Sequence, residues 1–372
     1  MTDFSTLLGA VLSDDAHLAQ DRAAAELRAG RPLLIEAGRD KILTAALDGA
    51  SPSLFQLFSS LKDSALVVTP QRARMMGLKV DHGVALPLAG LDLQGAKHLA
   101  SDPRLKAPGA WSEACGAAMG AIDLCKNALL LPAVLAAPLP EGADLPAGLQ
   151  RYRLDAPAGA AGTAGPPYDL EIVSEALVPM ANGITGRFMV FRGGPAQRDQ
   201  VAVVVGEPDP SQPVLVRAHS ACLTGDLFGS LRCDCGDQLE NALNRLGEEG
   251  GGVLLYLDQE GRGIGIGNKM RAYALQDDGF DTIDADAVLG FSADERRYEY
   301  AASILHTLGY RKVVLLTNNP EKIGGLTRAG IEVVGRQPLF GAVTAQNNAY
   351  LHTKEKRAQH LLQDLLRATA GE

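Results

Sequence analysis

The chain has 372 residues, of which 46% are hydrophobic and 21% charged, an ordinary globular composition that excludes a wholly disordered, collagen-like or coiled-coil protein. Its length predicts two domains. The net charge of -9 argues against a general nucleic-acid-binding protein, because that function needs a basic surface to neutralise phosphates. A local basic pocket for a small phosphorylated ligand remains compatible with this charge.

No segment predicts a membrane span or a secretory signal. The most apolar stretch, residues 128–138, contains Pro132 and is shorter than the ~20 residues that a span needs. The N-terminus lacks the basic region of a signal peptide. Five cysteines, an odd number, predict a reducing cytoplasm in which clustered thiols hold a metal or take part in catalysis.

The first half of the chain predicts a mixture of helices and strands. Residues 18–28 predict a helix that ends before Gly30, and residues 32–36 predict a short buried strand. Residues 65–68 predict another strand, after which a helix begins at Pro70 and runs to Met76.

A stretch rich in Pro, Gly and Ala follows at residues 137–168. It holds too few large apolar side chains to offset the entropy lost on ordering. We therefore predict a linker there, which closes a first domain over residues 1–168 and precedes a second over residues 169–372.

In the second half, strands alternate with helices, which predicts an α/β domain. The expected strands cover residues 186–191, 200–205, 214–218, 253–257, 312–316 and 331–334. The expected helices cover residues 237–246, 269–278 with Asn268 as N-cap, 296–308 and 320–329.

Three cysteines, Cys222, Cys233 and Cys235, lie close together in this half. Zinc prefers such ligands, and three thiolates leave one tetrahedral position open, as in catalytic sites that activate water. In an extended segment, the thiols of Cys233 and Cys235 would point to the same face. The alternative, three buried small apolar residues, is disfavoured by the polar local sequence. His219 is either a fourth ligand or a substrate-binding residue, and we favour the latter.

Residues 257–269 (LDQEGRGIGIGNK) form a glycine-rich segment whose backbone N–H groups can face an anion. Its spacing fits neither the P-loop nor the dinucleotide-binding fingerprint, which disfavours a P-loop kinase and a dehydrogenase. A tight turn without a ligand explains the glycines about equally well. Arg262, Lys269 and Arg271 favour a phosphate contact, because a triphosphate needs several cationic donors.

Together these segments resemble the GTP cyclohydrolase II family. The resemblance runs from about Val178 to about Leu362 and rests on AHSACLTGD, LRCDCGDQLENAL, YLDQEGRGIGIGNKMRAYALQDDGFDTIDA, LGFSADERRYEYAASIL and LLTNNPEKIGGL. It implies an α/β (α+β) protein with a mixed-sheet catalytic domain that opens the imidazole ring of GTP. Formate and pyrophosphate would be released, leaving a diaminopyrimidinone ribosyl phosphate, in the first step of riboflavin biosynthesis.

The resemblance also implies roles for single residues. The three cysteines would hold Zn²⁺, and Mg²⁺ would accompany the triphosphate. Asp294 would accept a proton and Tyr273 would assist ring opening. Arg296 would act on the α-phosphate, either as a nucleophile or by stabilising charge, since a guanidinium stays protonated. The residues that would contact GTP are Arg217, His219, Ser220, Gln238, Glu260, Gly261, Arg262, Thr282, Thr317 and Lys322.

Several of these positions have simpler explanations without the resemblance. Tyr273 would be a core residue of a helix, Asp294 an N-cap or first-turn acid, and Thr317 the end of a strand. One position departs from the family, because Ala221 stands where a glutamate is usual. That change removes a carboxylate beside the first cysteine and leaves the pathway and the exact reaction open.

The first half is faintly similar to dihydroxybutanone phosphate synthase, over residues 23–39 and 64–78. The acidic cluster that would hold magnesium there is replaced by residues 37–41 (AGRDK) and an uncharged run. Because Mg²⁺ needs carboxylate ligands, we predict no synthase activity and expect a domain that supports dimerisation or regulates the other half.

Three classes of function remain on the sequence alone. The first is a zinc-dependent GTP hydrolase that acts as a homodimer, without nucleic-acid or membrane partners. The second is a diverged paralogue, which stops at a formylamino product, serves another route such as uracil breakdown, or binds a nucleotide as a regulator; Ala221 favours it. The third is a structural zinc protein, which the glycine-rich segment and TNNPEK disfavour.

Overall fold

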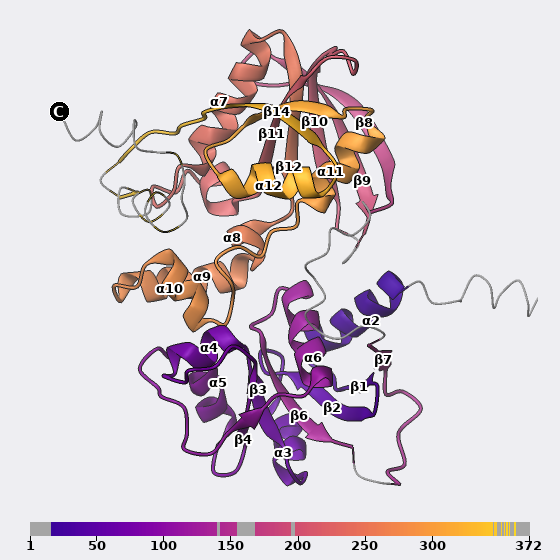
Figure 1. The fold of residues 1–372 in the computed structure, drawn as a ribbon, viewed down its shortest axis with the longest axis vertical. Coiled ribbons are helices and arrows are strands. Elements are labelled where there is room, and N and C mark those ends of the chain that lie inside the picture. Colours follow the sequence, from indigo (N-terminus) through magenta and orange to yellow (C-terminus); the bar gives the residue numbers. More distant parts are fainter. Residues whose placement is uncertain are drawn as a thin grey trace, which may run out of the picture. The chain divides into compact units, whose positions relative to one another are not determined.

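The chain forms two compact units, Met1–Ala161 with Pro195–Gln197, and Gly162–Gly194 with Arg198–Glu372. Each unit contains a seven-stranded sheet with helices packed on it, so the predicted mixed α/β class is confirmed (Figure 1). No helix in the described ranges combines the length and apolarity needed to traverse a bilayer. The computed structural model describes residues 16–139, 142–154, 168–194, 198–344, 346–347, 351, 353, 355, 357 and 361.

The sheet of the first unit has the strand order β5-β4-β3-β6-β2-β1-β7 and is antiparallel except for the pair β1–β7. Its strands are β1 (Leu33–Ala37), β2 (Asp40–Ala46), β3 (Ala65–Val68), β4 (Val84–Pro87), β5 (Ser112–Glu113), β6 (Ala133–Pro138) and β7 (Arg151–Arg153). Its helices are α2 (Ala16–Arg28), α3 (Pro52–Ser60), α4 (Pro70–Met75), α5 (Leu93–Ser101) and α6 (Gly116–Asn127).

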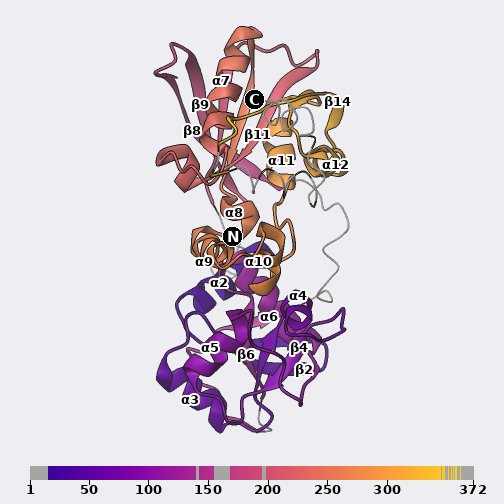
Figure 2. The same cartoon turned by 90° about the vertical axis from the view of Figure 1, so that its left-hand side faces the viewer.

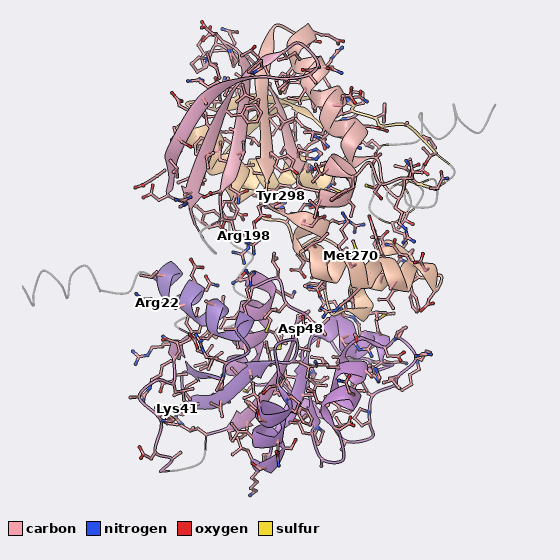
Figure 3. The ribbon with its side chains drawn as sticks, turned by 180° about the vertical axis from the view of Figure 1, so that it is seen from behind. Arg22, Lys41, Asp48, Arg198, Met270 and Tyr298 are labelled. Carbon is pink, nitrogen blue, oxygen red and sulfur yellow. The ribbon has the colours of Figure 1, made fainter. Side chains whose placement is uncertain are left out.

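Helices α2 and α6 share one core with this sheet, in which Leu27 and Ile122 pack with Ile35 of β1. The end of α2 requires a glycine, because Gly30 has φ +68° and a Cβ there would lie 2.4 Å from the carbonyl oxygen of Gly49. Asp48, which follows β2 in the chain and is labelled in Figure 3, accepts a hydrogen bond through its carboxylate from the backbone N–H of Leu131 at 2.9 Å. These contacts tie the loops of the first unit to its core.

The sheet of the second unit has the order β14-β13-β11-β12-β10-β9-β8. Its strands are β8 (Leu170–Pro179), β9 (Thr185–Gly193), β10 (Gln200–Gly206), β11 (Val214–Ser220), β12 (Gly251–Leu257), β13 (Lys312–Leu316) and β14 (Glu332–Gln337). Its helices are the π-helical turn η2 (Leu223–Leu227), α7 (Cys235–Glu248), α8 (Glu260–Gly263), α9 (Ile266–Asp277), α10 (Thr282–Val288), α11 (Glu299–Thr307) and α12 (Pro320–Arg328).

This second sheet is covered on both faces because its strands alternate. In β10, Ala202 and Val204 belong to the core that includes α11 and α12, whereas Val203 and Val205 belong to the core with α7. Strands β11, β12, β13 and β14 run parallel, so the carboxyl ends of the first three meet at one edge of the sheet. Helices α8, α9 and α10 lie beyond this edge (Figures 1 and 2).

Two predicted helix starts are wrong. Helix α9 begins at Ile266, and Asn268 lies inside it with its amide donating to the carbonyl of Ile264 at 2.9 Å. Helix α11 begins at Glu299, three residues after the predicted start at Arg296. The Asp294 carboxylate accepts a hydrogen bond from the backbone N–H of Arg296 at 3.0 Å, which favours a turn over a helix at this point.

The predicted linker over residues 137–168 is wrong in part. Residues 137–138 complete β6, and Arg151–Arg153 form β7, which pairs in parallel with β1. Tyr152 packs against the core between two outward arginines, a two-residue alternation too short to detect within a Pro- and Gly-rich stretch. Residues 155–167 of the predicted linker lie outside the described residues.

Candidate active site

A cavity of about 450 Å³ lies where the parallel strands of the second sheet end, a volume typical of small-ligand sites. Strand β11 leads into Ser220 and Cys222, β12 into Glu260, and β13 into Thr317. The cavity is lined by all the residues to which the resemblance assigns a role, namely Arg217, His219, Ser220, Cys222, Cys233, Cys235, Gln238, Glu260, Gly261, Arg262, Tyr273, Thr282, Asp294, Arg296, Thr317 and Lys322. Of the two other cations predicted to contact a phosphate, Lys269 lines the cavity and Arg271 does not.

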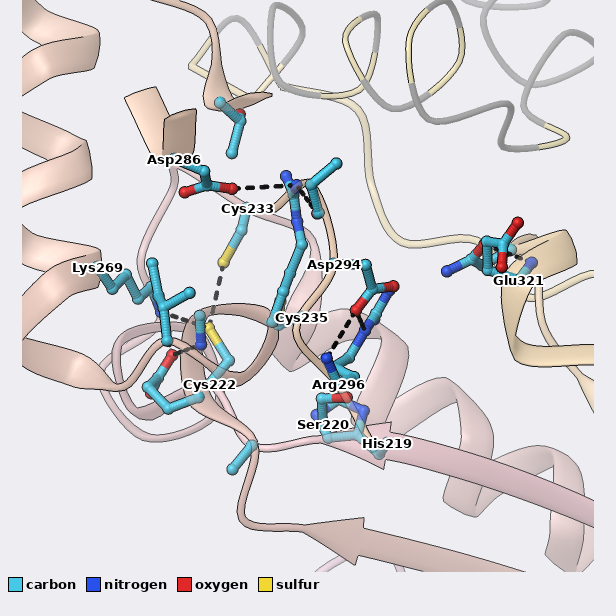
Figure 4. A pocket seen from close by; sticks show the side chains of 18 of the residues that line it. His219, Ser220, Cys222, Cys233, Cys235, Lys269, Asp286, Asp294, Arg296 and Glu321 are labelled. Carbon is cyan, nitrogen blue, oxygen red and sulfur yellow. Dashed lines mark hydrogen bonds and ion pairs between the residues drawn. The ribbon is translucent and has the colours of Figure 1, made fainter. Parts of the chain in front are cut away.

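The three cysteine thiols converge on one point of the cavity wall. Their sulfur atoms all lie within 4.8 Å of one another, and Cys222 Sγ is 3.7 Å from Cys233 Sγ (Figure 4). Two sulfurs ~2.3 Å from a tetrahedral zinc ion lie roughly 3.8 Å apart, so this spacing fits such an ion. The backbone approaches closely only because residue 225 is glycine, since a Cβ there would lie 2.9 Å from Cys233 Sγ.

The backbone conformation that brings the three thiols together differs from the predicted extended segment. Cys235 is the first residue of α7, and Cys233 lies in the turn before it, so the segment is not extended. Cys222 precedes the π-helical turn η2. The residues that the structure describes contain no other group of three or more metal-binding side chains.

His219 is held away from the role of a metal ligand. Its Nε2 lies 3.1 Å from Asp226 Oδ2, which also accepts hydrogen bonds from the Cys222 backbone N–H and the Tyr256 hydroxyl, both at 2.9 Å. Burial lowers the pKa of His219 although Asp226 opposes the shift, so the neutral ring is favoured. The Nδ1 atom is buried without a hydrogen-bond partner among the described residues.

Arg217 and Gln238 form a hydrogen-bonded pair in the wall of the cavity. Arg217 Nη2 donates to Gln238 Oε1 at 2.6 Å, and Gln238 Nε2 donates to Asp234 Oδ2 at 2.5 Å. Arg217 Nη1 donates to the Leu316 carbonyl at 2.9 Å, while its buried Nε has no hydrogen-bond partner among the described residues. The amide orientation of Gln238 is thereby fixed.

The glycine-rich segment places Glu260, Gly261 and Arg262 in the cavity wall through unusual backbone geometry. Gly261 and Arg262 have φ of +62° and +63°. A glycine adopts this conformation readily, whereas in Arg262 it is uncommon and stores strain. The Arg262 guanidinium donates to the Ala293 carbonyl at 3.0 Å and lies 3.4 Å from Asp286. Burial raises the pKa of Asp286 to about 7, with Arg262 opposing the shift.

Asp294 and Arg296 form a two-point ion pair on the opposite wall (Figure 4). Arg296 Nε donates to Asp294 Oδ1 at 2.8 Å, and Nη2 donates to Oδ2 at 2.5 Å. Burial acts to raise the pKa of Asp294, but the charge and hydrogen bonds of Arg296 outweigh it and hold the pKa below its ordinary value. Asp294 therefore stays ionised, and its predicted helix-capping role is replaced by this pair.

Two cations lie near the ring of Tyr273, on α9, with Arg232 Cζ at 5.0 Å and Lys269 Nζ at 5.6 Å from its centre. Burial raises the pKa of Tyr273, so the phenol keeps its proton at neutral pH. On the neighbouring helix α10, the first residue Thr282 accepts a hydrogen bond from Gln276 Nε2 at 3.3 Å.

The N-terminus of α12 completes the cavity. Asn319 caps this helix by accepting the Glu321 backbone N–H at 2.9 Å, and Thr317 Oγ1 accepts the Asn319 N–H at 3.0 Å. Lys322 is buried in the first turn, where its ammonium donates to the Ala218 carbonyl at 2.7 Å. Cationic side chain and helix N-terminus together favour an anion here.

The wall also contains residues that the sequence analysis missed, among them Arg232, Asp286 and Arg357. Arg232 stands inside the LRCDCG segment but was not singled out there, and Asp286 and Arg357 lie outside the quoted motifs. The TNNP turn gave a signal for its asparagines. Seven Lys or Arg side chains line the cavity against four Asp or Glu, in a chain whose net charge is -9. The cavity therefore favours a polyanionic ligand, which the acidic net charge of the chain left open.

Comparisons with known proteins identify the family. The family model of GTP cyclohydrolase II matches residues 171–338. GTP cyclohydrolase-2 of Xylella fastidiosa (strain 9a5c) is 47% identical over 345 residues, which cover 91% of this chain and 86% of the relative. GTP cyclohydrolase-2 of Azospirillum brasilense is 39% identical over 370 residues, with coverages of 94% and 95%.

Among solved structures, RibBX of A. baumannii, a two-domain 3,4-dihydroxy-2-butanone 4-phosphate synthase, covers 87% of this chain at 14% identity, and this chain covers 99% of it. The TM-score of that match is 0.28, too low to support an argument. The two GTP cyclohydrolase-2 relatives, by contrast, match across both units at high identity. The chain therefore belongs to the GTP cyclohydrolase II family and is a hydrolase of the class that acts on cyclic amidines.

Proposed function

We propose that this chain hydrolyses GTP to formate, pyrophosphate and a diaminopyrimidinone ribosyl phosphate, in the first step of riboflavin biosynthesis. The observation that carries the proposal is the single cavity that joins three converging thiols to a cation-rich wall. A reaction that opens a ring and cleaves a phosphoanhydride needs both features within the length of one nucleotide.

The thiols of Cys222, Cys233 and Cys235 are proposed to hold zinc. The 3.7 Å sulfur spacing and the closely approaching backbone at Gly225 support a thiolate-bound ion of that size. When bound there, zinc supplies Lewis-acid activation of water for attack on the imidazole carbon. The protein's contribution is to hold the guanine against this point.

Guanine recognition is assigned to Arg217, His219 and Gln238. Arg217 Nε and His219 Nδ1 are buried polar atoms without partners among the described residues, which favours ligand contacts for both. Gln238 is fixed by the bonds on either side of its amide, so it presents one orientation to a base edge. Ser220, Gly261, Arg262 and Thr282 are proposed to contact the same ligand.

The triphosphate is assigned to the wall formed by Arg296, Thr317 and Lys322, with Mg²⁺ as its counter-ion. Arg296 is paired with ionised Asp294, which favours a protonated guanidinium that stabilises charge at the α-phosphate over a nucleophile. Asp294 orients that guanidinium and receives a proton only if the pair opens. Tyr273, as a protonated phenol, is placed to donate a proton during ring opening.

The first unit is proposed to be a non-catalytic, synthase-like domain over residues 1–168, in a homodimeric protein. Glu36, the acid of β1, is paired with Lys41 at 3.0 Å and lies 3.9 Å from Arg153, which disfavours a magnesium ligand. In the second unit, the ten-residue edge strand β8 exposes Ile172, Val173, Leu177 and Val178, which favours association through this edge. Light scattering coupled to size exclusion tests the dimer.

The test of the proposed function is an assay of the zinc-loaded protein with GTP and magnesium, in which formate, pyrophosphate and the ultraviolet spectrum of the product are followed together. Formate and pyrophosphate in equal amounts are expected. Pyrophosphate without formate would assign a formylamino product and make Ala221, which lines the cavity, the first position to change to glutamate. Binding of GTP without turnover would contradict the proposal and favour a regulator.

A further inference from the structure

Lys269 does not occupy the position that its sequence context suggests. Beside Arg262 and Arg271 in a glycine-rich segment, it predicts a phosphate contact. In the structure Lys269 is 8% exposed, and its ammonium faces the thiols (Figure 4). It donates hydrogen bonds to Cys222 Sγ at 3.0 Å, to Thr224 Oγ1 at 2.9 Å and to Glu260 Oε1 at 2.8 Å.

These three contacts use the full capacity of the side chain. An ammonium group has three N–H donors and no acceptor. With one donor on the thiol, one on the hydroxyl and one on the carboxylate, a phosphate is bound by Lys269 only if one of these bonds breaks. The geometry therefore argues against a phosphate contact for this residue.

Glu260 holds the ammonium in place. Its Oε1 also accepts the Gly261 backbone N–H at 2.9 Å, and its Oε2 accepts the Leu223 backbone N–H at 2.6 Å. Leu223 directly follows Cys222, so the Glu260 carboxylate joins the glycine-rich segment to the loop that carries the thiols. Both carboxylate oxygens serve this network, whereas the sequence predicted a contact with GTP.

We propose that Lys269, anchored by Glu260, is a positioning residue of the metal centre: its ammonium donates to the Cys222 thiolate, fixes the direction of that ligand and offsets its negative charge. This inference rests on the proposed metal site. Three thiolates bring one more negative charge than a divalent ion neutralises, and a buried N–H donor on one sulfur reduces that excess. Groups that orient metal ligands in this way typically contribute a factor of ~10–100 to metal affinity.

The experiment measures zinc affinity by competition with a chromophoric chelator, in the full chain, without any assay of turnover. Lys269→Met keeps the length of the side chain and removes all three donors, and its zinc affinity is expected to fall by roughly 10–100-fold. Arg271→Met is the matched control, because Arg271 lies on the same helix, is exposed and does not line the cavity. Its zinc affinity is expected to equal that of the wild type.

A second readout is the thiolate-to-metal charge-transfer band of the cobalt-substituted protein. Loss of the N–H donor to sulfur in Lys269→Met is expected to shift this band, whereas Arg271→Met leaves it in place. Lys269→Arg keeps a charged donor and is expected to recover part of the affinity. Unchanged zinc affinity and an unchanged band in Lys269→Met would overturn the inference, most directly if binding of inorganic pyrophosphate were weakened instead.

The outcomes separate this inference from the proposed function. If the wild-type chain and Cys233→Ser bound zinc equally weakly, the metal centre itself would be wrong. If only Cys233→Ser lost zinc, the centre would stand and the role of Lys269 would fail. Should circular dichroism show that Lys269→Met does not fold, Glu260→Gln supplies the test, since loss of the anchor is also expected to weaken zinc binding.

Discussion

The two units have sheets of the same size but bury different chemistry. Among the described residues, three buried polar or charged side chains belong to the first unit, Thr44, Thr69 and Arg72, against fifteen in the second. The three side chains of the first unit form hydrogen bonds with backbone groups of the same unit, as Thr44 does with the Leu135 carbonyl at 2.9 Å. In the second unit many of them line the cavity.

The difference shows where the chain accepts an energetic cost for function. A buried polar group is unfavourable unless it is hydrogen-bonded, so a fold under no functional demand keeps few of them. The second unit leaves Arg217 Nε and His219 Nδ1 without described partners and keeps Arg262 in a strained conformation. If the first unit is built for stability and the second for binding, mutation of a buried polar residue should lower the stability of the first unit but the metal and substrate binding of the second.

The largest expected effect is that of Cys233→Ser in the second unit. Removing one of three thiols is expected to abolish tight zinc binding and to lower kcat/KM for GTP by at least about 10²–10³-fold, since an electrostatic group at the reacting atom is lost. Zinc content and formate release measure the result. Full activity in this variant would contradict the metal assignment, and unchanged fluorescence of Trp111 would show that the first unit is intact.

Asp286 gives the second unit an expected dependence of stability on pH. Burial raises its pKa from 3.8 to about 7 in the folded protein. Between these values the unfolded chain releases the proton that the folded chain retains, so stability falls as pH rises through this window and is level above it. The total change is roughly 4 kcal/mol at ~1.4 kcal/mol per pKa unit.

The check is the difference in unfolding free energy between the wild type and Asp286→Asn, measured by urea titration at several values from about pH 5 to about pH 7.5. The difference is expected to decrease by more than 1 kcal/mol towards the higher pH, following the slope of one proton. A difference independent of pH would mean that Asp286 is ionised in the folded protein throughout.

Arg72 tests the first unit in the same way. It donates to the Leu99 carbonyl at 3.0 and 2.9 Å and to the Asp102 carbonyl at 2.7 Å, and burial lowers its pKa to about 10, so it stays charged at neutral pH. Arg72→Met is expected to destabilise the first unit by about 2–4 kcal/mol, because the buried Leu99 carbonyl loses its guanidinium donor and the partly buried Asp102 carbonyl keeps only the Leu105 backbone N–H at 3.3 Å.

The single tryptophan, Trp111, reports unfolding of this unit by fluorescence. Arg74→Met is the control, because this exposed arginine of the same helix donates only to the Val80 carbonyl at 3.1 Å among the contacts described, and a change within about 0.5 kcal/mol is expected. Equal destabilisation by the two variants would show that burial of Arg72 contributes nothing.

Sequence patterns predicted the strands with strong apolar runs and missed elements built from small or exposed residues. β3 (ALVV) and β13 (KVVLL) have the predicted bounds, since β-branched residues there are flanked by turn residues. Helix α6 (GAAMGAIDLCKN) was missed because its buried face consists largely of Ala and Gly, which give a weak helical pattern. Strand β8 was missed because most of it is exposed.

For the site, the family motif located the residues of the cavity but not their contacts. Lys269 and Cys222 are 47 residues apart, and only the packing of α9 against the cysteine loop brings ammonium and thiol together. The motif likewise assigned Glu260 to the ligand, because sequence spacing carries no information about which donors a carboxylate already accepts from. Tertiary contacts of this kind had to come from the structure.

The smallest expected effect concerns the side-chain N-cap of one helix in each unit. Ser51 caps α3 by accepting the Leu54 backbone N–H at 3.1 Å, and Asn319 caps α12 by accepting that of Glu321 at 2.9 Å. Alanine at either position is expected to cost about 1 kcal/mol of stability. Only Asn319→Ala is expected also to raise KM for GTP several-fold, because α12 begins in the cavity wall and carries Lys322 in its first turn.

Steady-state kinetics and thermal unfolding of the two alanine variants measure this pair. Because both variants are expected to lose the same stability, a difference in KM between them reports the position of α12 in the cavity wall and not the loss of a helix cap. Equal KM values in both variants would mean that the N-terminus of α12 does not contact the triphosphate, and the anion-binding wall would then reduce to its arginine side chains.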